Sequence, residues 1–306
     1  MKASVIVPAH KCEETLPRTL RSLEEAAKGL DVEIIVSEDP DGKGLPWARN
    51  RGLDRARGEA VFFCDADDTV SPDFFRKPLE ELDRTGADFC IFQYERNPLK
   101  RGYALEGNER IREVFLPAFM GLSFDDVRRW NQGGSLLEKR EPGSVCRFAF
   151  RRDLIESHNI RFDEKLLIFE DASFICETAL YAGKTACIAE NLYNYAVNPD
   201  GITATVMNTR RHWDYKLEIL GERRRIAAAG GGGVWRFCEA SCVFSALEML
   251  TLWRRAGLSF AEFMRDLGRY LSEPVVRDAL AKFPLSVRHP LTAAAVTALR
   301  MWRVVP

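Results

Sequence analysis

The chain has 306 residues, 46% of them hydrophobic and 29% charged, and its 44 Lys and Arg nearly balance its 45 Asp and Glu, for a net charge of −1. This composition is that of a globular domain and excludes a disordered or collagen-like chain. A net charge of −1 offers no basic field that would neutralise phosphates, so we expect no nucleic-acid partner.

The first third of the sequence alternates short apolar runs with segments of helical periodicity. The expected strands are residues 3–7, 32–36, 60–64 and 87–94. The expected helices between them are residues 13–28, residues 46–56 and a segment opened by Pro72. Strands that alternate with helices of this length indicate βαβ units, so the sequence predicts an α/β fold with a mostly parallel sheet flanked by helices.

The middle of the chain is less regular, and its last third is helical. Residues 97–141 are polar and irregular, with short helical pieces such as 109–119. The elements expected next are a strand at 145–151, a helix at 172–182 and two closing strands at 186–189 and 192–197. The helices expected after that are 209–229, 234–256, 260–271, 274–283 and 290–304. Glycine loses much conformational entropy in a helix, so we expect the four glycines at residues 230–233 to form a flexible hinge.

The cysteines and apolar segments predict a compartment. The eight cysteines form no CxxC pair and mostly lie in apolar runs, which is typical of buried free thiols in a reducing cytoplasm. A strand begins almost at Met1, so no signal peptide is expected. The longest apolar stretch, residues 241–253, is too short to span a bilayer.

The strongest candidate for chemistry is the acidic segment 65–68, which follows the third apolar strand. In an extended segment Asp65 and Asp67 would point the same way. They lie past the carboxyl end of the strand, where open α/β sheets bind ligands. Two carboxylates there suit Mg²⁺ or Mn²⁺, which also grips phosphate oxygens. The alternative is a solvated turn that caps the helix opened by Pro72.

Two further groups lie near the ends of the first strands. Glu38 and Asp39 end the second strand and could accept hydrogen bonds from a base or a ribose, or could form an ordinary polar loop. Arg49 lies in the first turn of the next helix, where it could face a diphosphate or simply be a solvated surface residue.

A last acidic pair, Glu170 and Asp171, lies just before an apolar helix. Burying two adjacent carboxylates between apolar residues costs free energy unless one of them serves as an N-cap. Asp171 fits an N-cap of that helix, and it equally fits a general base at the mouth of a site.

Five segments of the chain resemble family 2 glycosyltransferases, the inverting enzymes of the GT-A fold, in order and spacing. They are SVIVP at 4–8, EIIV at 33–36, ARNRG at 48–52, CDADD at 64–68 and ED at 170–171. The stretch from Tyr193 and Tyr195 to residues 201–203 also looks like the family's Tyr-x-Tyr segment. The resemblance covers residues 1–205 and implies a nucleotide-sugar half (1–95), an acceptor half (96–205) and a helical C-terminal region (206–306).

The resemblance also implies roles for individual residues. Pro8 and Asp39 would line the nucleotide pocket, with Glu38 the less favoured contact, and Arg49 would lie near the diphosphate. Asp65 would face the ribose and the metal, Asp67 would ligate the metal, and Asp171 would be the catalytic base. His10 replaces the family's usual aromatic residue, yet it could stack on a base.

The resemblance implies an enzyme. It would be a metal-dependent inverting glycosyltransferase that moves a sugar from a nucleotide-sugar, expected to be UDP-linked, to a hydroxyl of a glycan or lipid-linked acceptor of the cell surface. One alternative is a degenerate GT-A domain that binds sugar nucleotides without catalysis. Another, a sugar nucleotidyltransferase, lacks that class's Gly-rich N-terminal loop.

The C-terminal segment 288–303 mixes apolar residues with three arginines. Such a basic amphipathic helix could lie on the inner face of a membrane, or it could pack on the catalytic domain.

Overall fold

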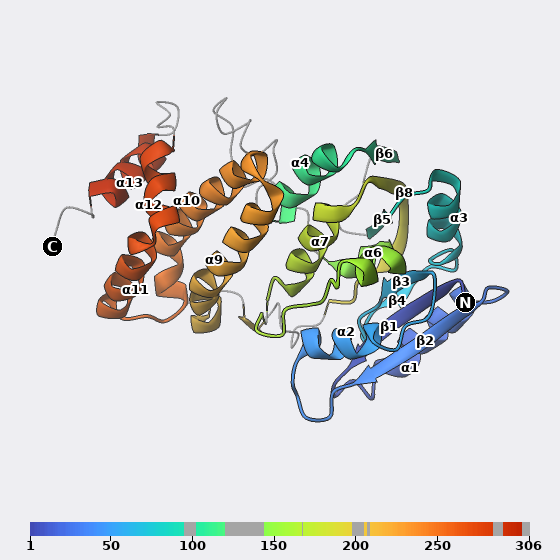
Figure 1. The fold of residues 1–306 in the computed structure, drawn as a ribbon. Helices are drawn as coiled ribbons and strands as arrows, with labels where there is room; N and C mark the ends of the chain where they lie inside the picture. Colours follow the sequence, from blue (N-terminus) through green and yellow to red (C-terminus); the bar gives the residue numbers. More distant parts are fainter. Residues whose placement is uncertain are drawn as a thin grey trace. The chain divides into compact units, whose positions relative to one another are not determined.

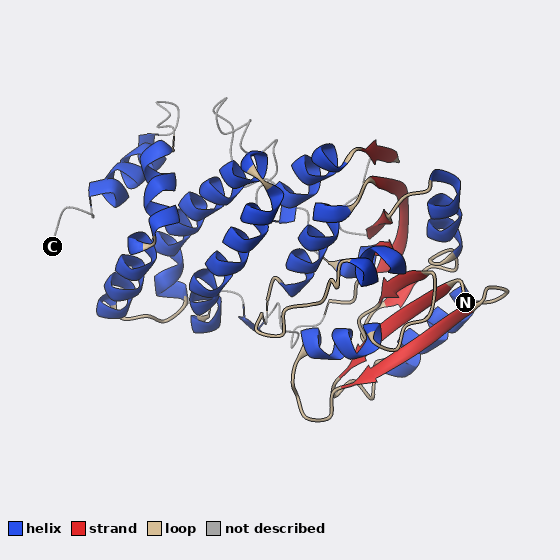
Figure 2. Cartoon of the chain, in the orientation of Figure 1, coloured by secondary structure: helices blue, strands red, loops and turns tan. Residues whose placement is uncertain are grey.

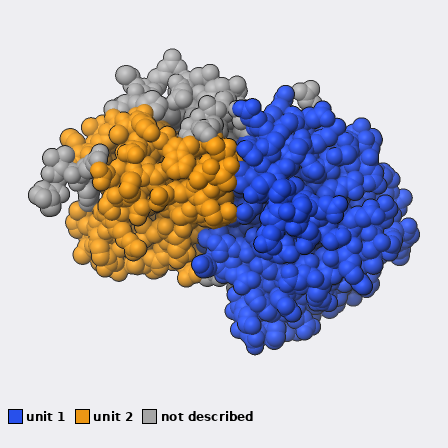
Figure 3. Space-filling view, viewed as in Figure 1, with its two compact units in different colours: residues 1–115, 141–198 blue, residues 116–140, 199–306 orange. Residues whose placement is uncertain are grey.

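The structure is a computed structural model, and it describes residues 1–94, 102–119, 144–166, 168–197, 205–206, 209–283 and 290–301. It divides into two compact units (Figure 3). Unit 1 comprises residues 1–115 and 141–198, and unit 2 comprises residues 116–140 and 199–306. The described strands all lie in unit 1, whereas the described part of unit 2 is helical (Figure 2).

Unit 1 is built on a mixed sheet of eight strands in the order β2-β1-β3-β7-β5-β8-β4, with β6 pairing on β8 (Figure 1). The strands are β1 (Ala3–Ala9), β2 (Val32–Glu38), β3 (Ala60–Phe63), β4 (Thr69–Val70), β5 (Phe89–Tyr94), β6 (Tyr103–Glu106), β7 (Phe148–Arg151) and β8 (Lys184–Asn194). Strand β1 runs parallel to β2 and β3, and β5 runs parallel to β8. The other pairs are antiparallel: β7 lies between β3 and β5 in the reverse direction, and β4 and β6 run against β8. The expectation of a mostly parallel sheet is therefore wrong, because period-2 and helical patterns do not show the direction in which β4, β6 and β7 pair.

The helices that begin in unit 1 contact this sheet where the apolar periodicity places them. They are α1 (Leu16–Ala26), α2 (Leu45–Leu53), α3 (Arg76–Thr85), α4 (Asn108–Phe119), the 3₁₀ helix η1 (Val145–Arg147), α6 (Arg152–Ser157) and α7 (Glu170–Tyr181). Helix α1 buries Thr19, Leu23 and Ala26, which share one helical face, and it packs against β4. The core beneath the helices is rich in buried, mostly edge-to-face phenylalanines, such as Phe75 against Phe62 and Phe74.

The position of α2 depends on a glycine. Helix α2 packs on β1 and β2, and a Cβ atom on Gly52 would lie 2.3 Å from Cγ2 of Ile6 in β1. Only glycine therefore allows this approach without a shift of the backbone or of Ile6. This contact sets the distance between the sheet and α2, the helix that carries Arg49.

Several segments differ from the sequence-based expectations. Residues 186–197 do not form two strands, because the single strand β8 continues through the exposed Glu190 and Asn191, with register shifts against β5. The segment after Pro72 is a turn, and α3 begins only at Arg76. Of the segment 97–141, the described part contains β6 and the expected helix, α4; the remainder lies outside the described residues.

The described part of unit 2 consists of helices close to the predicted ones. They are α9 (Arg210–Gly230), α10 (Gly232–Arg255), α11 (Phe260–Ser272), α12 (Pro274–Lys282) and α13 (Pro290–Met301). The expected hinge at 230–233 shrinks to one residue, Gly231, whose φ of 82° ends α9. A capping box formed by Ser259 and Glu262 starts α11.

Two other expectations concern thiols and membranes. All eight cysteines are free and seven are buried, as predicted; Cys12 is the partly exposed one. Among the described residues, no helix combines the length and the apolar character that crossing a membrane requires. Helix α13 packs on α10 and α12 within unit 2, burying Val296 and Leu299. The outer residues of the segment 288–303 lie outside the described part of the chain.

Candidate active site

The candidate residues converge on the carboxyl ends of three neighbouring strands. Pro8 lies buried near the end of β1, and His10 follows that strand. Asp39 follows β2, and Asp65 comes two residues after β3. Because these strands are parallel and adjacent, with β1 in the middle, their following residues emerge on one edge of the sheet.

Asp39 organises the loop after β2. Its carboxylate accepts hydrogen bonds from the backbone N–H groups of Lys43 (2.8 Å) and Gly44 (2.7 Å). Burial alone would raise the pKa of Asp39, but these hydrogen bonds, together with His10 and the N–H of Gly42, outweigh it and lower the pKa below its ordinary value. Nδ1 of His10 lies 2.7 Å from the carbonyl oxygen of Asp39, so the ends of β1 and β2 are tied together. Glu38, by contrast, is exposed.

Arg49 is the centre of the site and is not a surface residue, since it is only 1% exposed. Its Nη2 donates to Oδ1 of Asp65 (3.0 Å), and its Nη1 donates to Oε1 of Glu170 (3.2 Å) and to Oδ1 of Asp171. The guanidinium also lies over the ring of Phe162, 5.3 Å from its centroid. Arg49 thus joins the end of β3 to the start of α7, and 122 residues of sequence separate it from Asp171.

Two residues that follow Arg49 in the ARNRG segment, Asn50 and Gly52, position helix α2. The side-chain amide of Asn50 donates to the carbonyl of Phe162 and accepts from its N–H, both at 2.9 Å. Gly52 permits the close approach to β1 described above. Asn50 and Gly52 therefore hold α2 against the loop before α7 and against the sheet, and this fixes the direction of Arg49.

The start of α7 rules out the capping alternative for Asp171. The N-cap position is Phe169, which has a φ of 75°, and no side chain caps the helix. Oδ2 of Asp171 instead accepts from the N–H of Val145 in η1, at 3.2 Å. A bulky residue in the left-handed region is strained, and such strain is concentrated at functional sites.

The acidic segment 65–68 is a turn rather than an extended segment, since the N–H of Asp68 donates to the carbonyl of Asp65 (3.1 Å). The expectation that Asp65 and Asp67 alternate like strand residues is therefore wrong. The segment does not cap α3 either, since that helix begins later and has no side-chain cap. Helix α1 braces the turn instead: Arg18 donates to the carbonyl of Asp67, and Thr19 donates to that of Asp68.

Sequence reasoning missed two residues that complete this turn. Asp68 is fully buried, and its carboxylate accepts from the hydroxyl of Tyr193 and from the N–H of Ala196. The N–H of Asp65 donates to the same hydroxyl at 3.1 Å. Both residues lie inside segments that the sequence singles out, but only the fold shows that β8 meets the acidic turn. Burial raises the pKa of Asp68 to about 7.

The cluster around Arg49 contains more negative than positive charge. One guanidinium faces the carboxyl groups of Asp65, Glu170 and Asp171. Burial, reinforced by the neighbouring charge of Asp171, raises the pKa of Glu170 to about 8, and burial also raises the pKa of Asp171. The pKa of Arg49 is raised despite its burial, because the carboxylates stabilise its charge. We infer that Glu170 is largely protonated at neutral pH and that Arg49 remains charged.

The residues at the turn fit a divalent cation of the substrate-bridging kind. Asp65 and Asp67 are both partly exposed, and carboxylate oxygens are the donors that Mg²⁺ and Mn²⁺ prefer. In the described part of the chain, no group of three or more His, Cys, Asp or Glu is placed to hold a metal. A Mg²⁺ ion that bridges substrate phosphates needs only one or two protein carboxylates, which is what this turn provides.

Comparison with known proteins places this geometry in a family. The family model "Glycosyl transferase family 2" matches residues 37–113, the stretch that contains Asp39, Arg49, Asp65 and Asp67. The match supports a glycosyltransferase of family 2. The matched residues do not include Asp171.

Two curated relatives and one solved structure extend this comparison. The chain is 29% identical over 226 residues to the uncharacterized glycosyltransferase EpsJ of Bacillus subtilis, and 25% identical over 225 residues to the succinoglycan biosynthesis protein ExoO of Rhizobium meliloti. Each alignment covers 65% of this chain and 62% or 61% of the relative, so the chain spans about three fifths of their length.

The solved structure is that of residues 1–349 of S. aureus TarS in complex with UDP-GlcNAc. It matches with a TM-score of 0.64 at 18% identity, over 99% of this chain and 91% of that chain. At this identity the likeness shows the fold alone, and it confirms the predicted GT-A architecture with a helical C-terminal region.

Proposed function

We propose that the chain is a metal-dependent, inverting glycosyltransferase of cell-surface polysaccharide synthesis. It would move a sugar from a nucleotide-sugar, which we expect to be a UDP-sugar, to a hydroxyl of a glycan or lipid-linked acceptor. The name of ExoO, a succinoglycan biosynthesis protein, and the UDP-GlcNAc in the TarS structure support the acceptor and donor classes.

The observation that carries this proposal is the bridge made by Arg49. Its guanidinium connects Asp65, on the proposed donor side, to Asp171, the proposed base. A transferase needs both groups in fixed register, because the acceptor must attack the carbon whose leaving group is the nucleotide. The contact of Arg49 with the diphosphate stays a prediction, and its present partners are the three carboxyl groups.

The donor would lie along the strand ends. Pro8, His10 and Asp39, with Glu38 as the less favoured contact, would line the nucleotide pocket. Exposed His10 offers a ring face for the base, next to the loop that Asp39 organises. Asp65 would face the ribose.

Asp65 and Asp67 would hold Mn²⁺ or Mg²⁺, which when bound neutralises charge on the leaving diphosphate. The protein's own contribution is to fix the turn that presents these two carboxylates. Arg18 and Thr19 bind its carbonyl groups and so hold the backbone of the turn in place.

Asp171 would take the proton from the acceptor hydroxyl. Its carboxylate is oriented by Arg49 and by the N–H of Val145, and each oxygen retains a lone pair for the acceptor. A raised pKa makes Asp171 a stronger base near neutral pH than an ordinary aspartate. Attack on the face opposite the leaving group inverts the anomeric centre.

All proposed site residues lie in unit 1. We therefore propose that residues 1–205 carry the activity, with donor contacts in residues 1–95, and that residues 206–306 form a helical region. The proposed location is the cytoplasm, where residues 288–303 would contact the inner face of the membrane.

The test is a titration of the whole chain with UDP in the presence and absence of Mn²⁺, followed by a UDP-release screen across nucleotide-sugars. We expect UDP binding that strengthens with Mn²⁺, and UDP release from one donor class. Metal-dependent binding without release from any donor, even with candidate acceptors, would favour the alternative of a non-catalytic sugar-nucleotide-binding protein. Binding that ignores Mn²⁺ would contradict the metal assignment.

A further inference from the structure

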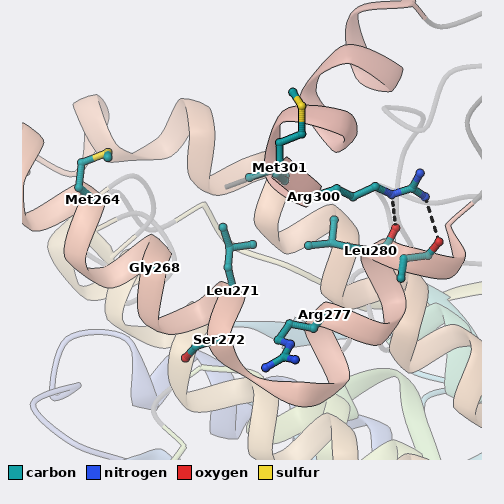
Figure 4. A pocket seen from close by; sticks show the side chains of 10 residues that line it. Met264, Gly268, Leu271, Ser272, Arg277, Leu280, Arg300 and Met301 are labelled. Carbon is teal, nitrogen blue, oxygen red and sulfur yellow. Dashed lines mark hydrogen bonds between the residues drawn. The ribbon is translucent and has the colours of Figure 1, made fainter. Parts of the chain in front are cut away.

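Unit 2 contains a pocket of about 1000 Å³ between α11, α12 and α13 (Figure 4). This volume lies at the upper end of the range for small-molecule sites. The residues that line it are Met264, Gly268, Leu271, Ser272, Arg277, Leu280, Ala281, Leu299, Arg300 and Met301. None of them belongs to the site at the strand ends.

The pocket exists because small residues face it while its walls are packed. Leu271, Leu280 and Leu299 are buried and fix the walls. A Cβ atom built on Gly268 would meet no heavy atom within 4 Å, so the missing side chain leaves open space in the middle of α11. Met264 adds a flexible, polarisable side chain of the kind that adapts to irregular apolar ligands.

The charge of the lining is positive. Two of its residues are arginines and none is acidic. Arg300 donates to the carbonyl oxygens of Leu280 (2.6 Å) and Phe283 (2.6 Å), which holds α13 on the end of α12, and no carboxylate among the described residues pairs with it. Arg277 is exposed, and within the described ranges it makes no ion pair with a carboxylate. An apolar pocket with these two cations is complementary to an anionic amphiphile.

We propose that this pocket binds a phosphorylated long-chain lipid, with the hydrocarbon chain between α11 and α13 and the phosphate at Arg277. This deepens the proposed function and rests on it in one respect, since a lipid phosphate is the chemical class of a lipid-linked acceptor. Binding itself requires neither the donor nor transfer. The guanidinium can donate two parallel hydrogen bonds to phosphate oxygens, and Arg300 adds to the positive field.

The experiment measures the affinity of the whole chain for farnesyl monophosphate by calorimetry, with farnesol and inorganic phosphate as the separate halves of the ligand. We expect farnesyl monophosphate to bind, farnesol to bind about tenfold more weakly, and inorganic phosphate not to bind measurably. Arg277→Gln should weaken farnesyl monophosphate about tenfold and leave farnesol unchanged.

A pair of matched glycine variants tests the location. Gly268→Leu places a side chain in the open space of the pocket and should weaken farnesyl monophosphate at least about tenfold. Gly221→Leu is the control, because Gly221 also lies within a helix of unit 2 with no heavy atom within 4 Å of its Cβ position, yet it does not line the pocket. Both variants should fold, since each replaces glycine inside a helix.

Equal binding by Gly268→Leu and the unchanged chain would overturn the proposal. So would binding to phosphatidylglycerol vesicles without binding to farnesyl monophosphate, because that result indicates a membrane surface contact. UDP binding at the strand ends is measured separately, so loss of lipid binding with UDP binding intact contradicts this inference and leaves the proposed function standing.

Discussion

The site at the strand ends and the pocket of unit 2 differ in the chemistry that builds them. The first concentrates one arginine and three carboxyl groups, and Arg49 and Glu170 in it are almost fully buried. The second has apolar walls, a glycine at position 268 that leaves open space, and two arginines that pair with no carboxylate of the described residues. Buried charges must be paired to be tolerated, so they leave a distinctive sequence pattern; a pocket lined by leucines and a glycine does not.

Removal of the central cation should destabilise the buried cluster strongly. Arg49→Met would leave three carboxyl groups without their shared partner, and we expect a loss of about 3–5 kcal/mol in the free energy of unfolding. Urea denaturation measures it. Arg51→Met, an exposed residue of the same helix, is the matched control and should change stability by less than about 0.5 kcal/mol. A small effect of Arg49→Met would show that the cluster is not held together by this residue.

A second test concerns the protonation of Glu170. Its pKa of about 8 in the folded chain exceeds the ordinary value of 4.5, so the folded state binds more protons than the unfolded state between these pH values. Stability should therefore fall as pH rises from 4.5 to 8, by up to about 1.4 kcal/mol per pH unit for this group. In Glu170→Gln the decline should flatten, whereas exposed Glu80→Gln should keep it. An unchanged slope in Glu170→Gln would contradict the assignment of a protonated Glu170.

A third test concerns the acidic turn. Tyr193→Phe removes the hydroxyl that binds Asp68 and the N–H of Asp65, and we expect a loss of about 1–2 kcal/mol in stability. Tyr181→Phe is the control, since that ring is exposed and stacks on His158. Equal stability of the two variants would show that the hydroxyl of Tyr193 does not stabilise the acidic turn.

The smallest expected effect lies in unit 2. Gly268→Ala should raise the free energy of unfolding by up to about 1 kcal/mol, because alanine favours the helix and its Cβ enters open space. Gly221→Ala should give a similar gain. Thermal unfolding of both variants checks this, and a loss of stability at Gly268 alone would mean that the pocket is filled in solution.

Most helices and strands could be predicted because their signals are local in the sequence. The apolar run of β1 and the one-face pattern of α1 are local signals, and so is the acidic turn after β3. The pairing of Tyr193 with Asp68 is not local, since 125 residues separate them. A hydrophobic period of 2 or 3.6 residues predicts strands and helices, but it does not show which strands pair. The order and direction of the strands in the mixed sheet could therefore not be predicted.

The same limit applied to Arg49. Its expected place near the start of a helix is compatible with a diphosphate contact or a surface position, and nothing near it in sequence reveals three carboxyl partners. Those partners come from β3 and α7, which only the fold brings to α2. The pocket of unit 2 shows the limit most clearly, because its lining residues read as an ordinary helical core.

The most direct test of the central claim is to measure transfer and donor affinity together in Asp171→Asn. If Asp171 is the base, kcat for transfer should fall by about 10²–10⁴-fold, while the Kd for UDP with Mn²⁺ changes by less than about threefold. Asp83→Asn, an exposed residue in a surface ion pair, should behave like the unchanged chain. Transfer retained by Asp171→Asn, with the variant folded and binding UDP, would contradict the account.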